Sequence, residues 1–476
     1  MKRLQQNGAS VIIMVLITFT VISMIVGVVV FRTLNNYHTL VQISSWQEAL
    51  LAAESGNDTG MAALRATLSD SNNAWNGWST ADANGNTLAN SGRTCAVSNI
   101  THTGEGNSQL NATVTVDAPA QLIDSSGRQW YRIRATGITY LPGNTKLIGP
   151  DKRDHLLRRL SLVWDRKTGT RVMQPQATRL IEVIAQPVAF QNALVAAGLI
   201  QLNNYNIVID SYDSRDPSKS TNGSYDPAKF QQNGDVATDG NVIDAGNAYI
   251  YGDASTNAGA VINAAHVTGL QRTDFYQDLI PVQRPSWTVI NGNYGDIVNN
   301  MTLVGGSQSN PQRYKLSSVK ETGNNVLSLA PSAPGVESYV EIWITGDMNL
   351  QGNGEIELQP HVHAKIYVEG NMAINGNGFI NDSSQAPYLE ILGVHPDDGA
   401  SRSVTLTGNG SFIGALYAPN ADVVLSDGGT NGTYCGSIVA KTITMNNHTA
   451  VHYDEALGDA PFLTDYKIAS WFEDNK

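Results

Sequence analysis

Two histidines that lie two residues apart are the first candidates for metal chemistry. His361 and His363 belong to a run that alternates apolar and polar residues, so both side chains would leave the same face of a strand. Glu369 would share that face, but about 20 Å beyond His363 if the strand is extended. The spacing is therefore compatible with a metal pair and with two exposed histidines on a strand surface.

Two acidic stretches concentrate the oxygen ligands that calcium prefers. They are residues 210–216 (DSYDSRD) and the loop 395–399 (HPDDG). Neither has the spacing of an EF-hand loop, and polar corner loops would have the same composition. We expect no cofactor, with calcium left open as an alternative.

The short motifs that mark common catalytic sites are missing from the sequence. It contains no G-x-S-x-G elbow, no H-E-x-x-H pair and no P-loop. Aspartates are abundant, but their spacing singles out no pair for acid–base hydrolysis of glycosides. We therefore expect a protein that is not an enzyme and assign no catalytic residue.

The two cysteines, Cys95 and Cys435, are a candidate disulfide. In an exported protein such a bond would join an early region to the last strands. Sequence alone does not show that the two residues meet, and single buried thiols are common. No Cys/His cluster with zinc spacing accompanies them.

The elements that must position any site begin with an apolar stretch near the start of the chain. Residues 10–31 (SVIIMVLITFTVISMIVGVVVF) contain no charged residue. At about 1.5 Å per residue, a helix of this length spans roughly 33 Å, enough to cross a bilayer core. Its polar residues are Ser and Thr, whose hydroxyls can bond to the helix backbone. We predict a membrane anchor here.

Charge and composition indicate where the rest of the chain lies. Lys2 and Arg3 precede the span and only Arg32 follows it closely, so the positive-inside tendency exports everything after Arg32. Charged residues make up only 15% of the chain and glycines number 44, which is typical of an exported, turn-rich β protein. The net charge of −12 argues against nucleic acid as a partner.

Helical periodicity continues beyond the span. Apolar residues from Leu34 to Leu51 recur mostly at intervals of three and four. The segment 55–58 (SGND) should weaken or interrupt the helix. We predict one long helix over residues 9–66, half in lipid and half amphipathic.

The start of the chain resembles a type IV pilin. A short basic leader ends in Gly8 and is followed by Ala9 and the long apolar helix. The segment QNGASVIIMVLITF, with RTLN at 32–35 and EALLAAESG at 48–56, is similar to PilX-type minor pilins and pilus assembly proteins. The resemblance implies a pilin-like helix that packs in a filament.

The same resemblance implies a processing site. In that family a prepilin peptidase removes a leader, which here would be residues 1–8, by cutting between Gly8 and Ala9. The family usually has a glutamate at the fifth position after the cut, where this chain has Ile13. That glutamate is thought to pair with the N-terminal amine of a neighbouring subunit, so this chain departs from the pattern at that contact.

Residues 67–188 are rich in Asn, Ser, Thr and Gly and contain four strand-like runs. The runs are residues 112–116, 130–137, 159–164 and 178–185. They predict a small antiparallel β-sheet head, which the resemblance to pilins also implies.

From Ala189 a short pattern recurs along the chain. Triplets with an apolar first and third residue, except for Asp244, are followed by turns rich in Gly and Asn. The seven triplets are residues 200–202, 242–244, 348–350, 372–374, 404–406, 423–425 and 443–445. Short strands joined by tight turns are what the coils of a β-solenoid need, since each coil buries its apolar side chains on the next.

We therefore predict a β-solenoid over residues 189–460, followed by a C-terminal tail at 461–476. Prolines and Gly-Asn turns at about 270–335 predict an irregular excursion. The run GALYAPNADVVL (414–425) resembles an uncharacterised β-solenoid domain at the C terminus of exported, pilus-associated proteins. The expected fold class is mainly β with a long N-terminal α-helix, a small sheet head and a β-solenoid (β-helix-like) domain.

These features together favour a structural role. We expect a minor-pilin-like type IV pilus assembly or surface-display protein, held by a single pass in the inner membrane or placed in or at the tip of an extracellular pilus. Its partners would be other pilins or pilus assembly proteins and the prepilin peptidase. The alternative is a membrane-tethered envelope protein that binds or processes carbohydrate. The sequence names no ligand.

Overall fold

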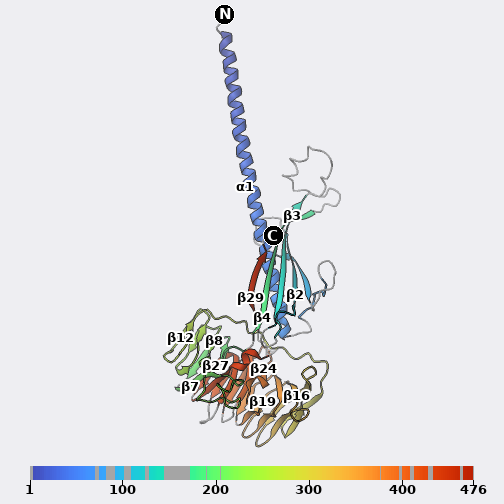
Figure 1. Cartoon of the computed structure of the whole chain (residues 1–476), viewed down its shortest axis with the longest axis vertical. Helices are drawn as coiled ribbons and strands as arrows, with labels where there is room; N and C mark the ends of the chain where they lie inside the picture. Colours follow the sequence, from blue (N-terminus) through green and yellow to red (C-terminus); the bar gives the residue numbers. More distant parts are fainter. Residues whose placement is uncertain are drawn as a thin grey trace.

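The computed structural model consists of one long helix, an antiparallel sheet packed on its C-terminal half, and a parallel β-body beyond that sheet (Figure 1). The expectation of a mainly β protein with one long N-terminal helix is confirmed. The structure describes residues 4–69, 74–81, 92–100, 109–123, 128–143, 172–188, 190–203, 205–375, 377–395, 399–407, 412–426, 433–446, 448–460 and 465–474.

Helix α1 (Leu4–Ser69) is continuous over the whole predicted range. The threonines of its apolar half bond to the helix backbone as predicted: Thr18 Oγ1 donates to the Met14 carbonyl at 2.9 Å. The predicted interruption at 55–58 is wrong. Gly56 faces the sheet, and a Cβ at this position would lie 2.9 Å from the Cβ of Ala135. The glycine allows a close helix–sheet contact and does not break the helix.

The sheet that covers α1 is antiparallel, with strand order β1-β2-β3-β4-β29. Its helix-facing side buries alternate residues of the central strands, including Val114, Ile133 and Ile181, against Ala53 and Leu64 of α1. The strands are β1 Arg93–Ile100, β2 Gln109–Asp117, β3 Tyr131–Gly143, β4 Val172–Val188 and β29 Asp465–Asp474. We call this sheet and the part of α1 that it covers the head.

Three of the four runs predicted for the head fall in its strands β2, β3 and β4. The fourth run, residues 159–164, lies outside the described residues. The predicted 461–476 tail is wrong in its described part, because β29 pairs antiparallel with β4 from Asp465 opposite Val188 to Asp474 opposite Leu180. Two adjacent strands of one sheet thus lead into and out of the parallel body.

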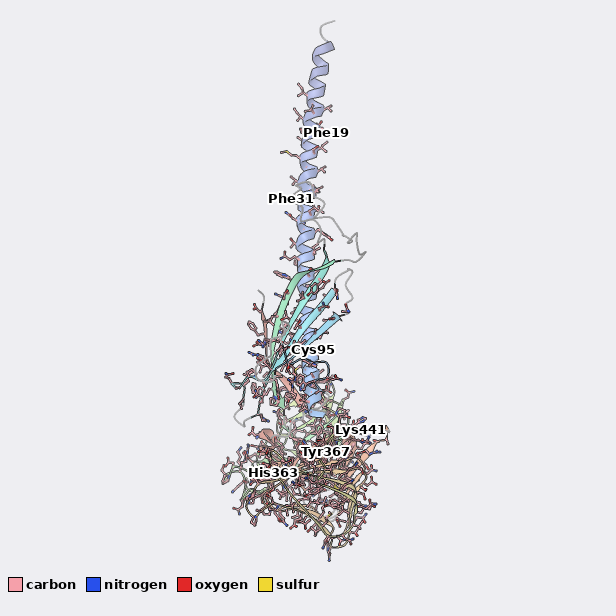
Figure 2. The ribbon with its side chains drawn as sticks, turned by 90° about the vertical axis from the view of Figure 1, so that its right-hand side faces the viewer. Phe19, Phe31, Cys95, His363, Tyr367 and Lys441 are labelled. Atoms are coloured by element: carbon pink, nitrogen blue, oxygen red, sulfur yellow. The ribbon has the colours of Figure 1, made fainter. Side chains whose placement is uncertain are left out.

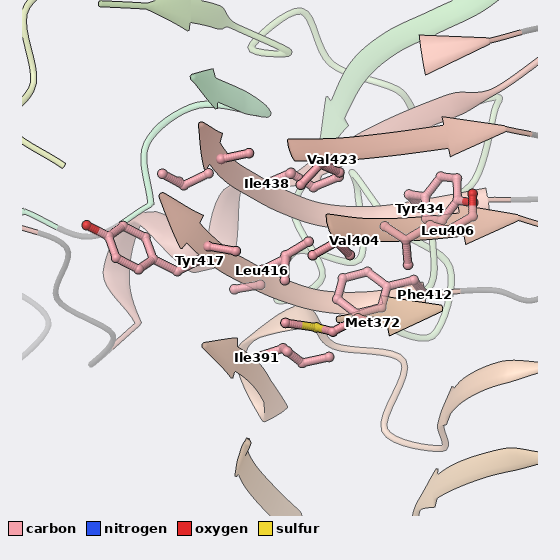
Figure 3. Packing of buried hydrophobic residues seen from close by; sticks show 14 of the residues in the cluster. Met372, Ile391, Val404, Leu406, Phe412, Leu416, Tyr417, Val423, Tyr434 and Ile438 are labelled. Atoms are coloured by element: carbon pink, nitrogen blue, oxygen red, sulfur yellow. The ribbon is translucent and has the colours of Figure 1, made fainter. Parts of the chain in front are cut away.

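The parallel body is built from short strands that close around one apolar core. Figure 3 shows Met372, Ile391, Val404 and Leu416 packing there from different strands. The strands are β5 Leu194–Ala196, β6 Ile200–Asn203, β7 Tyr205–Tyr212, β8 Val236–Thr238, β9 Val242–Asp244, β10 Asn247–Ile250, β11 Ala254–Thr256, β12 Ala260–Ile262, β13 Gln271–Arg272, β14 Gly292–Ile297, β15 Met301–Val304, β16 Gln312–Glu321, β17 Val326–Ala330, β18 Ser338–Ile344, β19 Met348–Leu350, β20 Glu355–Leu358, β21 Val362–Val368, β22 Met372–Asn375, β23 Gly378–Asn381, β24 Leu389–Gly393, β25 Arg402–Thr407, β26 Phe412–Ser426, β27 Thr433–Asn446 and β28 Ala450–Asp454.

Consecutive strands of the body pair with the equivalent strands of the next repeat. Strands β18, β19 and β20 pair in parallel with β21, β22 and β23. Matching inward residues come together in this register, so that Ile342 lies beside Ile366 and both are fully buried. All seven predicted triplets lie in one ladder of parallel strands, in the order β19-β22-β25-β26-β27-β6-β9. The expectation that the triplets recur as neighbouring strands is confirmed.

The order of strands in space differs from their order in the chain. The early strands β6 and β7 pair with the late strands β27 and β28, so β5 to β13 lie beyond the end of the chain's last repeat. Strand β14 then begins at the opposite end of the body. We call the junction between β7 and the late strands β27 and β28 the seam.

Residues 273–291 connect the two ends of the body by crossing outside the parallel strands. Along this crossing, Tyr417 Oη donates to the Ile280 carbonyl at 2.9 Å and the His395 amide donates to the Val282 carbonyl at 2.7 Å. The predicted excursion at 270–335 is therefore too long. Strands β14 to β17 fall inside it and are regular members of the parallel ladders.

Candidate functional site

Large apolar side chains are exposed along the N-terminal half of α1 (Figure 2). Those between Ile13 and Phe31 are 50–77% exposed. Within the described part of the chain, α1 is the one helix long and apolar enough to cross a membrane. This is compatible with a single-pass anchor.

The exposed apolar surface continues well past Phe31. We call its continuation the juxtamembrane stripe; its members are 44–66% exposed and comprise Leu34, Tyr37, Leu40, Ile43, Trp46 and Leu51. From Ile13 to Leu51 the helix is about 58 Å long at about 1.5 Å per residue. A bilayer core is only about 30 Å thick. A membrane that covers the first part therefore leaves the stripe uncovered.

The head holds the stripe in place. Gly137 of β3 lies so close to α1 that a Cβ there would overlap the backbone of Ala49 and Ala53. Thr139 Oγ1 donates to the Ser45 carbonyl at 3.0 Å. Because these contacts clamp α1 within the range of the stripe, the free helix projects from a rigid base.

The predicted processing residues lie near the start of this helix. Gly8 and Ala9 fall within the helical range Leu4–Ser69, and Ile13 is 60% exposed. Cleavage between Gly8 and Ala9 stays a prediction.

A second feature is a set of buried polar residues at the seam. Cys435, His452 and Asp210 occupy adjacent register positions on β27, β28 and β7. His452 Nδ1 hydrogen-bonds to Asp210 Oδ1, and Tyr225 Oη donates to Asp210 Oδ2 at 2.7 Å. The Tyr225 ring stacks on the His452 ring at 3.5 Å. We call these four residues the seam cluster.

The seam cluster has the residue types of a nucleophile, a base and an orienting acid, but not the environment. Cys435, His452 and Asp210 are only 2–6% exposed. Burial raises the pKa of the Cys435 thiol to about 12, which keeps it protonated at neutral pH. The arrangement therefore favours a structural role, in which these polar side chains hold the early strand β7 against the late strands β27 and β28.

The two histidines singled out by their spacing share one carboxylate. His361 Nδ1 lies 2.7 Å from Glu337 Oε1, and His363 Nε2 lies 2.9 Å from Glu337 Oε2. These hydrogen bonds, with that of His361 the largest contribution, lower the pKa of Glu337. The His363 ring also stacks between Tyr339 and Tyr388, at 4.5 and 4.2 Å.

No metal centre emerges from these residues. Among the described residues, no group of three or more His, Cys, Asp or Glu side chains is arranged to hold a metal ion. In the acidic stretch 210–216, Asp213 pairs with Arg215 at 3.0 Å and Asp216 accepts from Ser218 Oγ at 2.7 Å. Of the loop 395–399, residues 396–398 lie outside the described residues.

The candidate disulfide is not formed. Both cysteines are free: Cys95 lies on β1 of the head and Cys435 on β27 of the body. The physical reason is that the two strands belong to separate sheets.

Sequence reasoning missed a ladder of side-chain caps between repeats. Asp347 Oδ1 accepts from the Asn371 amide at 2.8 Å, and Asn371 Oδ1 accepts from the Ser403 amide at 3.0 Å. Asp235 and Asp253 do the same near the other end, where Asp235 Oδ1 accepts from the Asp253 amide at 2.7 Å. A detectable signal exists, because each of these four residues follows a glycine. The seam cluster and β29 had no comparable signal.

The profile of a domain of unknown function (DUF7305) matches residues 336–460, which lie within the parallel body. No curated protein matches the chain. One solved structure that aligns is the competence-associated pilin ComZ from Thermus thermophilus, with 12% identity over 90% of this chain and 97% of that chain. The TM-score of this alignment is 0.24.

Proposed function

We propose that this protein is a minor-pilin-like subunit that assembles with other pilins or pilus assembly proteins and displays the parallel body outside the inner membrane. The observation that carries the proposal is the juxtamembrane stripe. The apolar surface of α1 is about twice as long as a bilayer core, so a membrane can shield only part of it from water. A neighbouring helix with an exposed apolar face could shield the rest.

The build of the head supports the same role. The C-terminal half of α1 is clamped to an antiparallel sheet, while its N-terminal half projects freely. This division suits a subunit that is held in the membrane before assembly and buries its helix against other helices afterwards. Processing between Gly8 and Ala9 by a prepilin peptidase belongs to this proposal.

For the parallel body we propose a β-solenoid that acts as a structural or adhesive surface and not as an enzyme. Support for a solenoid comes from the parallel pairing of all seven triplets in one ladder. Support for a non-catalytic role comes from the burial of the seam cluster, which offers its thiol to no substrate.

The test is whether the chain travels with pili and whether the stripe is required. We would shear pili from cells producing the full chain and probe them for wild type, for L40E/I43E and for the control L270E. Leu270 is 66% exposed and lies in the body, far along the chain from the stripe. We expect pilus association to be lost with L40E/I43E alone. Equal association of all three chains would contradict the proposal.

Deletion of residues 10–31 should release the chain from membranes and abolish pilus association together. Mass spectrometry of the mature chain supplies the remaining check. Ala9 as the first residue supports pilin processing, whereas an intact Met1 indicates a plain anchor.

A second candidate function is glycan binding, favoured by a strip of aromatic rings on the body. Tyr249 stacks on His266 at 4.4 Å, and Phe230 meets Tyr251 at 5.0 Å. Tyr249 and Phe230 are 41% and 37% exposed. Aromatic faces with polar tips suit sugar rings, which have apolar faces and polar edges. Binding of a neutral polysaccharide that is lost in Y249A, with pilus association intact, would separate this function from the first.

A further inference from the structure

A hollow of about 290 Å³ opens on the surface of the body beside strands β8, β11 and β13. Its volume is close to the lower end of the range for small-ligand pockets. The lining combines carboxylates with a guanidinium, an amide and an aromatic ring; these side chains belong to Asp235, Asp253, Asp274, Arg272, Asn192 and Tyr276. The Tyr276 side chain is 73% exposed. The hollow is therefore polar, open to solvent and separate from the seam cluster.

Two of the carboxylates of the hollow lie on neighbouring strands. Asp235 and Asp253 come directly before Val236 and Ala254, which are paired residues of β8 and β11. Asp235 Oδ1 accepts from the Asp253 amide, and Asp253 Oδ1 accepts from the Leu270 amide, both at 2.7 Å. Among the described residues, no donor bonds to the Oδ2 atom of either carboxylate. The hollow thus presents two acceptor oxygens to a ligand.

The hollow also has an excess of negative charge. Arg272 and Asp274 neutralise each other, because Nη2 of the arginine lies 2.8 Å from Oδ2 of the aspartate. In the described part of the chain, no basic side chain forms an ion pair with Asp235 or Asp253. Burial raises the pKa of Asp235, and the charge of Asp253 adds to this effect. Because both effects disfavour the ionised carboxylate, a positively charged group beside it would be stabilised.

The strip of aromatic rings on the body leads into this hollow. Outward and buried residues alternate from Tyr249 to Ser255, so that Tyr249, Tyr251, Asp253 and Ser255 leave the same face of the chain. The Tyr249 and Tyr251 rings stack with their centres 6.4 Å apart. From Tyr249 to Ser255 an extended chain spans at most about 20 Å. One surface therefore has aromatic rings at one end and unpaired carboxylates at the other.

We propose that the strip and the hollow together bind an oligosaccharide with free amino groups, whose sugar rings lie on Tyr249 and Tyr251 and whose ammonium group lies between Asp235 and Asp253. The inference rests on the second candidate function, glycan binding, and gives it a ligand class. An ammonium group has three N–H donors and no acceptor, which suits a site of carboxylate oxygens. A lysine-rich peptide would supply the charge, but it has no sugar ring for the tyrosines.

The test compares a soluble glucosamine oligosaccharide with its fully N-acetylated form, in which the amine has lost its charge. Each is titrated calorimetrically into the purified full chain in detergent, at a pH at which the amine is charged. We expect the glucosamine form to bind about tenfold more tightly or better, because it alone makes charge-assisted hydrogen bonds to the carboxylates.

D235N/D253N should remove this preference. Asparagine keeps the Oδ1 acceptor that holds the next strand, so the variant retains the backbone contacts of the hollow. The matched control is D244N/D296N, which removes two negative charges elsewhere on the body and should leave the preference unchanged. Loss of the preference in both double variants would overturn the inference, because net charge and not the hollow would be responsible.

The other outcomes separate this inference from glycan binding. Equal affinity of the wild-type chain for the two oligosaccharides would overturn the role of the hollow; if that binding is lost in Y249A, glycan binding on the strip still stands. Binding of neither oligosaccharide would overturn both, while the pilus role is judged by its own test on sheared pili. Polylysine that binds as tightly as the glucosamine form, with the same loss in D235N/D253N, would also overturn the inference, because the hollow would then recognise a cationic peptide.

Discussion

The head and the parallel body bury their apolar side chains in different ways. In the head, one face of an antiparallel sheet packs on a single helix, and the contact depends on a few small residues such as Gly56 and Gly137. In the body, each strand stacks on equivalent strands to either side, so the core is spread over many similar contacts. The head concentrates its stability at one interface, whereas the body distributes it.

The difference explains how the two parts are joined. Repeats stacked strictly in chain order would put the two ends of the body far apart. Here the early strands stack beyond the late ones, so the chain enters the body after Val188 and leaves it before Asp465, a pair of opposed residues in the head sheet. The crossing at 273–291 makes this order possible. A large body is thus inserted between two paired strands without opening the sheet.

The largest expected effect is at the seam. Asp210→Ala removes the hydrogen-bond partner of the buried His452 and of the half-buried Tyr225. We expect the body to lose about 2–4 kcal/mol of unfolding free energy, because each buried polar group that loses its hydrogen-bond partner costs about 1–3 kcal/mol. Denaturant unfolding monitored by hydrogen exchange would localise the loss to β7 and β28. The control is Asp216→Ala, at a nearby aspartate that is only half-buried and accepts from Ser218 rather than from His452 or Tyr225. An equal loss of stability in both variants would contradict a stabilising role of the seam cluster.

The next effect concerns the helix–sheet contact. Gly137→Val places side-chain atoms where the α1 backbone lies. We expect the head to be destabilised by about 1–3 kcal/mol or to separate from α1. Hydrogen exchange should increase in β2 to β4 and stay unchanged in the body. Gly295→Val is the matched control, because a Cβ at Gly295 meets no atom within 4 Å. Equal loosening of head and body would mean that the two parts do not act separately.

A smaller effect is expected from one buried carboxyl group of the body. Glu321 is fully buried, and neither of its carboxyl oxygens has a hydrogen-bond partner among the described residues. Burial raises its pKa. The folded pKa of Glu321 is above the unfolded value of about 4.3. The contribution of this carboxyl group to the free energy of unfolding is therefore complete below that pH, and it is lost as pH rises through the folded pKa.

Glu321→Gln should remove this pH dependence. We expect the variant to be more stable than wild type at neutral pH, by about 1.4 kcal/mol for each unit by which the pKa is raised, and to lose that advantage in acid. Thermal unfolding across the pH range measures it. Parallel stability curves for the two chains would show that Glu321 is not the responsible group.

The smallest effect is chemical and leaves stability unchanged. Cys95 on the partly exposed β1 should react with a maleimide in the folded chain. Cys435 should not, because a pKa of about 12 leaves about one thiolate in ten thousand at pH 8 and burial blocks access. Mass spectrometry of the labelled peptides gives the ratio of maleimide labelling at Cys95 to that at Cys435. Labelling of Cys435 in Asp210→Ala but not in wild type would tie its protection to the seam.

Local pattern was enough to predict much of the fold. The apolar run and its helical continuation predict α1, because helix periodicity depends on residues three and four apart. The triplets with their Gly/Asn turns predict the strands that pair in one ladder, because inward and outward residues alternate within each strand. The juxtamembrane stripe also has a signal in the sequence, because apolar residues continue at helical spacing beyond the length that a bilayer requires.

Only the tertiary structure decided which strands become neighbours. The pairing of β27 with β6, of β28 with β7 and of β29 with β4 joins residues more than 200 positions apart. No short pattern encodes such a choice, because every repeat presents a similar apolar edge to every other. For that reason the seam cluster, the separation of Cys95 from Cys435 and the position of β29 in the head could not be derived from periodicity. These three features depend on which strands pack against each other, and that choice is made only when the whole chain folds.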